Sequence, residues 1–134
     1  MTLKKGGELR GCIGNFSAQT PLHKMVQQMA IAAALEDPRF ESVSPQELPA
    51  VELEISVLSG LSPITPEEVV VGTHGLFITL GFHRGVLLPQ VPVEWGWERD
   101  EYLDHLCLKA GLPRGTWREP EVVLESFTAQ VFSE

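Results

Sequence analysis

The residues best suited to chemistry in this chain lie in one short segment, Leu9-Arg10-Gly11-Cys12-Ile13-Gly14. Cys12 is a candidate nucleophile, because a thiolate forms covalent intermediates readily. Arg10 carries a permanent charge that would lower the pKa of a nearby thiol and could hold an anionic group. Gly11 and Gly14 permit positive φ or a close approach of the backbone to a ligand. A simpler interpretation makes Cys12 a small buried side chain in a tight hairpin.

His74 is the histidine best placed to assist a nucleophile. It lies in Gly72-Thr73-His74-Gly75, a turn before an expected strand, where it would be exposed and could act as a general base or a metal ligand. No two histidines show His-x-x-x-His spacing on a helix, so the sequence does not support a zinc-hydrolase site. The alternative for His74, and for the other histidines (His23, His83 and His105), is a structural or solvent-facing ring.

Glu94 and the tryptophans after it form a second candidate group. Glu94 could donate or accept a proton during a reaction. Trp97, together with Trp95, could form an aromatic wall against a flat ligand. The alternative is that the two rings only fill a gap in the fold.

Arg39 and Gln90 are further candidates for contact with a ligand. Arg39 could bind an anion through two parallel hydrogen bonds. The alternative is an interaction with Asp37 that caps the preceding helix. Gln90 could offer its amide to a ligand or make an ordinary hydrogen bond within a loop.

The composition restricts the class of protein. The 134 residues suit one domain, and the net charge of −8 disfavours binding to nucleic acid, which needs a basic surface. No apolar run approaches the ~20 residues of a membrane span, and the first residues lack the apolar core of a signal peptide. We therefore expect a cytoplasmic protein, in which both cysteines are reduced. The two cysteines form no Cys-x-x-Cys pair, so the sequence does not support a zinc ribbon or a thioredoxin-type motif. Cys107 is expected to be a buried structural thiol on a helix.

The hydrophobic pattern predicts a mixture of strands and helices. A helix with Thr20 as its N-cap and Pro21 as its first residue should end before Pro38. Ser44 and Thr65 each begin a capping-box pattern that should open a short helical turn. The other expected elements are strands at 1–3, 9–13, 51–57, 75–80, 85–88 and 122–132, and a helix at 98–110.

The strand at 51–57 indicates the type of sheet. Its apolar residues alternate with Glu52, Glu54 and Ser56, which is typical of a strand with one buried face. Such alternation favours an antiparallel sheet, because parallel strands are usually apolar on both faces. The order of elements shows no regular β-α-β repeat. The sequence therefore predicts an α+β fold, with an antiparallel sheet and flanking helices.

The segment from Leu9 to Asn15 resembles the hallmark motif of the AMMECR domain family, named after a human chromosomal region linked to Alport syndrome, midface hypoplasia and elliptocytosis. Other segments agree with this family in the same order and extend the resemblance over essentially the whole chain, 1–134, as a single domain. They are Asp37-Pro38-Arg39-Phe40, Leu53-Glu54-Ile55-Ser56-Val57-Leu58, Gly72-Thr73-His74-Gly75-Leu76, Leu87-Leu88-Pro89-Gln90-Val91, Glu94-Trp95-Gly96-Trp97 and Lys109-Ala110-Gly111-Leu112-Pro113.

The resemblance implies two lobes of unequal size, with the shared motifs near a cleft between them. Family members usually carry some tens of further residues, including helical sequence, before the point where this chain begins. Without that segment an apolar sheet surface would be uncovered, and such surfaces favour association. We therefore expect that another chain, such as a second copy in a homo-oligomer, covers this region, or that the start of the sequence is misplaced.

Two functions remain open from the sequence. In the first, the chain is an enzyme or enzyme subunit acting on a small molecule, with Cys12 as nucleophile, His74 as its activator and Glu94 as an acid-base group. Arg10 and Arg39 would hold an anion. The family is encoded beside, or fused to, Memo-type and radical S-adenosylmethionine (SAM) proteins, which implies a shared modification pathway; the cofactor and substrate are unknown. In the second, the same residues form a groove for a partner protein, without catalysis.

Overall fold

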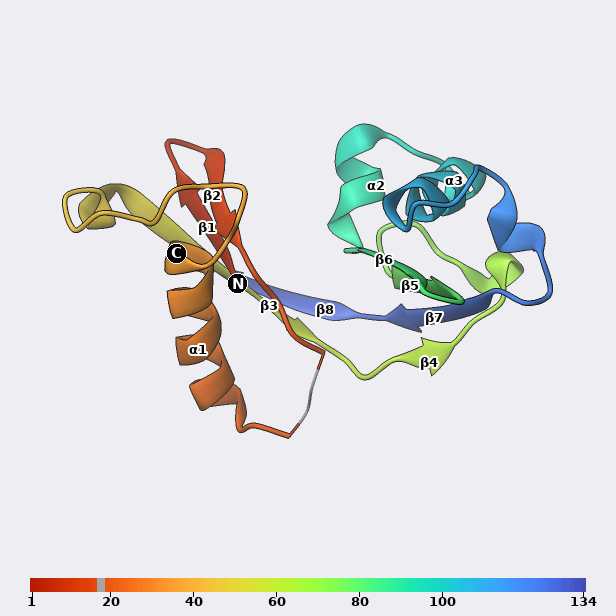
Figure 1. Cartoon of the computed structure of the whole chain (residues 1–134), viewed down its shortest axis with the longest axis horizontal. Coiled ribbons are helices and arrows are strands. Elements are labelled where there is room, and N and C mark those ends of the chain that lie inside the picture. Colours follow the sequence, from red (N-terminus) through yellow and green to blue (C-terminus); the bar gives the residue numbers. More distant parts are fainter. Residues whose placement is uncertain (17–18) are drawn as a thin grey trace. The chain divides into compact units, whose positions relative to one another are not determined.

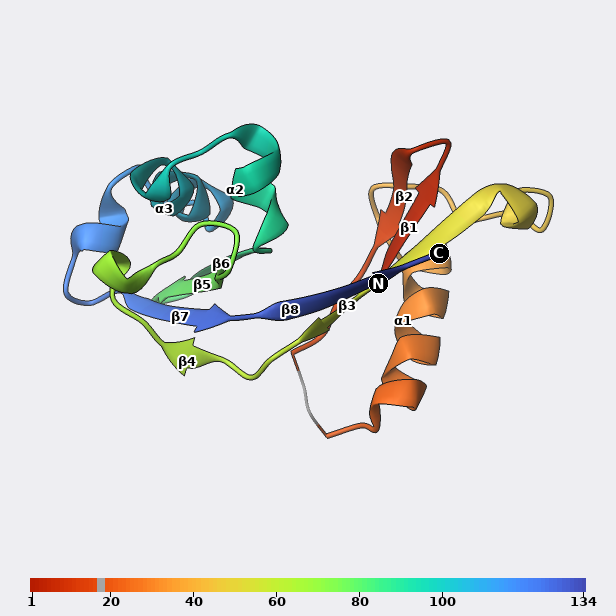
Figure 2. The same ribbon diagram turned by 180° about the vertical axis from the view of Figure 1, so that it is seen from behind.

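The structure is a computed structural model that describes residues 1–16 and 19–134, and the chain divides into two units (Figure 1). Unit 1 comprises Met1–Val57 and Gln130–Glu134, and unit 2 comprises Leu58–Ala129. Each unit contains a four-stranded sheet and at least one helix, which the reverse view shows equally well (Figure 2). The α+β prediction is confirmed, with two sheets where the sequence suggested one.

Unit 1 has a sheet in the order β2-β1-β3-β8, and β1 pairs antiparallel with both β2 and β3. The predicted β1–β2 hairpin is confirmed, and Gly6 and Gly7 at its turn have φ of 59° and 80°. Helix α1 packs against β1 and β2 (Figure 1). The bounds are β1 Thr2–Lys5, β2 Glu8–Cys12, α1 Leu22–Leu35, 3-10 helix η1 Leu48–Ala50, β3 Val51–Leu58 and β8 Ala129–Ser133.

Helix α1 begins one residue later than the sequence suggested. Pro21, with ψ of 142°, is the N-cap, and its carbonyl accepts the first hydrogen bonds of the helix from Lys24 and Met25. The prediction of Thr20 as N-cap is therefore wrong. Proline fixes φ but leaves ψ free to be extended, so it serves as well just before the helix as at its first residue. The helix ends before Pro38, as predicted.

Unit 2 has a sheet in the order β4-β7-β5-β6, in which β7 pairs antiparallel with β4 and β5, and β5 pairs antiparallel with β6. Helix α3 packs on β5 and β6, and its Tyr102, Leu103 and Leu106 are fully buried in the core with Leu76 and Ile78. The bounds are β4 Ser62–Pro63, η2 Pro66–Glu68, β5 Gly75–Leu80, β6 His83–Leu87, α2 Gln90–Trp95, α3 Arg99–Lys109, η3 Thr116–Arg118 and β7 Val123–Phe127.

Two predictions at the end of the chain and before α3 are corrected. The long strand expected at 122–132 is divided at Thr128 into β7 and β8, which belong to different sheets. Helix α2 was not expected, because Pro89 and Pro92 were interpreted only as the end of the strand at 85–88. Both prolines occupy the start of α2, where backbone N–H groups have no partner within the helix, so their missing donors cost little.

Candidate functional site

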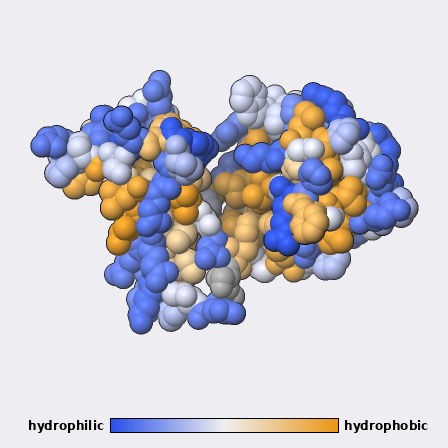
Figure 3. Space-filling model, viewed as in Figure 1, coloured by the Kyte–Doolittle hydropathy of each residue, from blue (hydrophilic) through white to orange (hydrophobic). Residues whose placement is uncertain are grey.

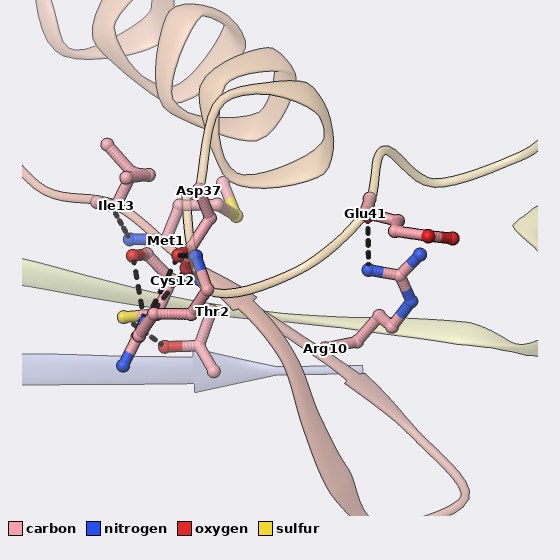
Figure 4. Close-up of polar contacts among 8 residues, drawn as sticks. Met1, Thr2, Arg10, Cys12, Ile13, Asp37 and Glu41 are labelled. Carbon is pink, nitrogen blue, oxygen red and sulfur yellow. Dashed lines mark hydrogen bonds and ion pairs between the residues drawn. The ribbon is translucent and has the colours of Figure 1, made fainter.

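Cys12 lies at the end of β2 and is partly exposed. Its backbone N–H donates to Oδ2 of Asp37 at 2.9 Å, which ties the strand end to the segment after α1 (Figure 4). Its Sγ lies 3.5 Å from the hydroxyl oxygen of Thr2, the residue opposite it on β1. The thiol is therefore held by a fixed backbone and one neighbouring hydroxyl.

Asp37 joins Cys12 to Arg39. Arg39 donates to Asp37 from its backbone at 3.0 Å, from Nε at 3.1 Å and from Nη2 at 2.8 Å, and the same Nη2 lies 3.5 Å from the carbonyl oxygen of Cys12. The Asp37 side chain is 2% exposed, whereas that of Arg39 is 54% exposed. The Asp37–Arg39 interaction weighed from the sequence is thus present, and it leaves much of the guanidinium open to solvent.

The charges of this cluster stabilise one another. The hydrogen bond from Arg39, followed by the N–H of Cys12, holds the pKa of Asp37 well below its usual range against the opposing effect of burial. The pKa of Arg39 is raised, first by its hydrogen bond to Asp37 and to a lesser degree by the nearby Cys12. Asp37 and Arg39 therefore both stay charged beside Cys12 throughout the physiological pH range.

Arg10 is engaged elsewhere in unit 1. It donates to both carboxylate oxygens of Glu47 at 3.0 and 3.2 Å and to the carbonyl of Glu41 at 2.8 Å. Its side chain points away from the Cys12 cluster (Figure 4). Of the two arginines predicted to hold an anion, Arg39 is the one whose guanidinium approaches Cys12, and Arg10 as an anion anchor stays a prediction.

The two glycines of the motif have different surroundings. A Cβ on Gly11 would lie 2.2 Å from the carbonyl oxygen of Ala33, so only glycine lets β2 approach α1 this closely. A Cβ on Gly14 would meet nothing within 4 Å. Gly11 is therefore required by packing, and packing places no such demand on Gly14.

In unit 2, His74 is fixed at both its ring and its backbone. Its Nδ1 accepts the backbone N–H of Val70 at 3.0 Å, and its carbonyl accepts the Tyr102 hydroxyl at 2.9 Å. The same hydroxyl lies 3.2 Å from the carbonyl of Leu87, just before α2. Since Nδ1 is an acceptor, a neutral His74 carries its proton on Nε2 and presents a donor; acting as a base would require the bond to Val70 to break.

The other candidates of unit 2 lie in and after α2. Gln90 is its first residue and is partly buried, and Glu94 is exposed near its end. Trp97 stacks on His105 with a centroid distance of 3.8 Å and an angle of 3° between the rings, and Trp95 stacks on Trp97 at 6.3 Å. The two tryptophans thus form a stacked wall of rings.

The nine predicted site residues are divided between the units. Unit 1 contains Arg10, Gly11, Cys12, Gly14 and Arg39, and unit 2 contains His74, Gln90, Glu94 and Trp97. Their convergence on one substrate stays a prediction. Within residues 1–16 and 19–134, no three or more His, Cys, Asp or Glu side chains gather as a metal site, and no helix is long and apolar enough to span a membrane.

Comparison with known proteins identifies the family. The family model AMMECR1 matches residues 1–132, nearly the full length of the chain. The chain belongs to the AMMECR1 family. The match spans both units, so the Cys12 cluster and the His74 turn are parts of one family domain.

AMMECR1-family relatives of this chain occur in archaea. A protein of Thermococcus gammatolerans is 46% identical over 132 residues, which cover 94% of this chain and 64% of that protein. A protein of Methanocaldococcus jannaschii is 46% identical over 134 residues, covering 95% and 67% respectively. The chain therefore spans about two thirds of the length of these relatives.

A crystal structure of an uncharacterized protein from Pyrococcus horikoshii shares the fold. It superposes with a TM-score of 0.93 and 39% sequence identity, over 99% of this chain and 71% of that one.

Asp37 and Tyr102 hold candidate site residues in place, but the sequence did not indicate either of them as a site residue. Asp37 stood out in the sequence only as a partner of Arg39, because its bond to Cys12, 25 residues away, leaves no local signal. Tyr102 fits the apolar face of α3, and nothing nearby indicates that its hydroxyl reaches His74 and Leu87. Both contacts depend on the tertiary fold.

Proposed function

We propose that this chain is an enzyme, or the subunit of one, that acts in the cytosol on a small anionic molecule with Cys12 as the nucleophile. The observation that carries the proposal is the partly exposed Cys12 beside the half-exposed guanidinium of Arg39. A neighbouring cation favours the thiolate, the reactive form of cysteine. The same guanidinium has open N–H groups that suit an anionic part of a substrate.

The residues of unit 2 complete the proposal. Glu94, exposed on α2, acts as the acid-base group, and Gln90 and Trp97 contact the substrate. His74, as held by Val70, serves as an Nε2–H donor to a negatively charged oxygen, a role that the structure favours over that of a base.

Memo-type and radical SAM proteins are the proposed partners. This part rests on the gene neighbourhood of the family, which implies that the chain takes part in a modification pathway with them. A pulldown from the native cell, with metabolite analysis, tests it; recovery of neither protein class would contradict it.

Alkylation of Cys12 with iodoacetamide at a series of pH values tests the nucleophile. We expect Cys12 to be alkylated faster than an ordinary exposed thiol at neutral pH. Cys107 is an internal control, because it is buried and burial raises its pKa. Cys12→Ser should abolish the rapid labelling, and labelling that follows an ordinary thiol would contradict the proposal.

The alternative is a non-catalytic interaction module, and one observation favours it. A groove of about 350 Å³ in unit 1 is lined almost wholly by apolar side chains, among them Leu3, Ala34, Val51 and Leu53. Apolar residues gather over the α1 region of unit 1 in Figure 3. Ile31, Leu35 and Leu48 at this groove are each more than half exposed.

A second copy of this chain is the occupant proposed for the groove, because two such apolar surfaces would cover each other. Sedimentation should show a dimer that Leu48→Glu disrupts, because a charge would be placed against apolar surface. The exposed Val123→Glu on β7 in unit 2 is the matched control. A monomer for the unmodified chain would contradict this role of the groove.

A further inference from the structure

Three stacked rings stand on the surface of unit 2. Trp95 lies on Trp97 at 6.3 Å with 14° between the planes, and Trp97 lies on His105 at 3.8 Å with 3°. Trp95, at the end of the stack, is 70% exposed. One large aromatic face therefore remains open to solvent while its other side is supported by protein.

The backbone fixes this arrangement. Helix α2 ends at Gly96, whose φ of 70° lies in the left-handed region that favours glycine. The N–H of Gly96 bonds to the carbonyl of Val93, and that of Trp97 bonds to the carbonyl of Pro92. These bonds close a turn at the end of α2, which places Trp97 beside Trp95. A ligand would meet rings that are already ordered, so it would lose little entropy to order them.

Three carboxylates lie close in sequence to the stacked rings. Glu94 precedes Trp95, Glu98 follows Trp97, and Glu101 lies one helical turn before His105 on α3. All three are exposed, and in the part of the chain that the structure describes they make no ion pair. The net charge of −8 adds to this negative potential.

Unit 2 already binds a guanidinium by this combination of groups. Arg118 lies over the ring of Trp117, 4.0 Å from its centroid, and its Nη2 lies 4.0 Å from Oδ2 of Asp100. An aromatic face and a carboxylate thus hold one arginine of the chain itself. The Trp95 stack offers the same two groups with its outer face open.

We propose that the open face of Trp95 is a docking site for an arginine side chain in a basic segment of a partner protein. The guanidinium stacks on the indole, and the nearby carboxylates attract the basic segment around it. The charge distinguishes this occupant from an uncharged sugar or an apolar side chain, which would gain nothing from the carboxylates. The site does not depend on Cys12.

Nuclear magnetic resonance can follow the three tryptophan indole N–H signals during a titration. The probe is the capped peptide Gly-Arg-Gly-Arg-Gly, and the matched control replaces each arginine by citrulline, which is uncharged but of similar shape. We expect the arginine peptide to shift the signals of Trp95 and Trp97 and not that of Trp117. The citrulline peptide should bind about two- to fivefold more weakly, the range of an exposed cation–π contact.

Variants of the protein complete the test. Trp95→Ala should weaken binding by a similar factor, read from the Trp97 signal, and Phe82→Ala, which removes a fully exposed ring on another loop, should have no effect. Glu98→Gln with Glu101→Gln should weaken binding and reduce its dependence on salt. Equal binding of the two peptides, no binding of either, or unchanged binding by Trp95→Ala would overturn the proposal. A neutral disaccharide that shifts the same signals more strongly would do so as well.

Discussion

The two units hold their candidate residues by different chemistry. In unit 1, the carboxylate of Asp37 binds the backbone of Cys12 and the guanidinium of Arg39. In unit 2, the uncharged hydroxyl of Tyr102 binds the carbonyls of His74 and Leu87. Asp37 must be ionised to accept all of its hydrogen bonds, whereas Tyr102 must keep its proton, and burial raises the pKa of that hydroxyl.

Because of this difference, we expect acidification to disturb the candidate residues of unit 1 before those of unit 2. Asp37 and Glu47, both with lowered pKa values, organise unit 1. The geometry of the His74 turn depends on Tyr102, which stays protonated at neutral and acid pH. The two units can also be observed separately, because all three tryptophans belong to unit 2 and Cys12 belongs to unit 1.

The largest effect is expected at Gly11 in unit 1. Gly11→Ala would place a Cβ against the carbonyl of Ala33, and neither backbone can move aside without separating β2 from α1. We expect a loss of about 3 kcal/mol in the free energy of unfolding, measured in urea. Gly14→Ala is the matched control and should stay within about 0.5 kcal/mol of the unmodified chain. Equal effects of the two changes would show that the close packing of β2 on α1 is wrong.

Tyr102→Phe should destabilise unit 2 by roughly 1.5 kcal/mol, because two carbonyls lose a buried donor while the ring still fills the core. Urea unfolding followed by tryptophan fluorescence measures this loss. The loss should be the same at pH 5 and pH 8, since the hydroxyl is protonated at both. A loss of stability that differs between pH 5 and pH 8 would contradict the role of Tyr102 as an uncharged donor.

Asp37→Asn should reduce the acid sensitivity of unit 1. A carboxyl whose pKa is lowered by folding stabilises the protein above its unfolded value of about 3.9, and the contribution is lost as pH falls from there towards the folded value. In the unmodified chain, protection of the Cys12 backbone N–H from hydrogen exchange under mild urea should therefore fall below about pH 4 before tryptophan fluorescence changes. In Asp37→Asn, this protection should be lower at neutral pH and change less on acidification; an unaltered acid profile would count against the Asp37 link.

The smallest effects separate the two arginines of unit 1. Arg39→Gln should slow the alkylation of Cys12 at neutral pH, because the cation beside the thiol is removed. Arg10→Gln should leave the rate nearly unchanged, since the guanidinium of Arg10 binds Glu47 and Glu41 and points away from Cys12. Initial rates of Cys12 alkylation by iodoacetamide measure both effects. A larger decrease for Arg10→Gln than for Arg39→Gln would show that Arg10 is the activating residue.

The sequence predicted those structural features that depend on residues close together in the chain. The positive φ of Gly6 and Gly7 was foreseen from the hairpin, and the Thr65–Glu68 capping box is confirmed by hydrogen bonds in both directions. The buried Cys107 on α3 also followed from the apolar face of that helix. In each case the determining residues lie within a few positions of one another.

The rest depended on contacts between distant residues. The β-favouring run at 122–132 shows no interruption in its own pattern, yet Thr128 divides it, since β7 pairs with β5 and β8 joins the sheet of unit 1. Arg10 was expected to act on Cys12 because it is close in sequence, whereas its partner Glu47 is 37 residues away. Spacing along the chain could not indicate which guanidinium approaches Cys12.

The central claim is that Cys12 is a reactive nucleophile beside Arg39. Brief treatment with one equivalent of iodoacetamide at neutral pH, followed by mass spectrometry of the digested chain, tests this claim directly, and the buried Cys107 is the control. The account predicts that Cys12 is alkylated faster than free glutathione while Cys107 stays unmodified; alkylation of Cys12 no faster than that of glutathione would contradict it.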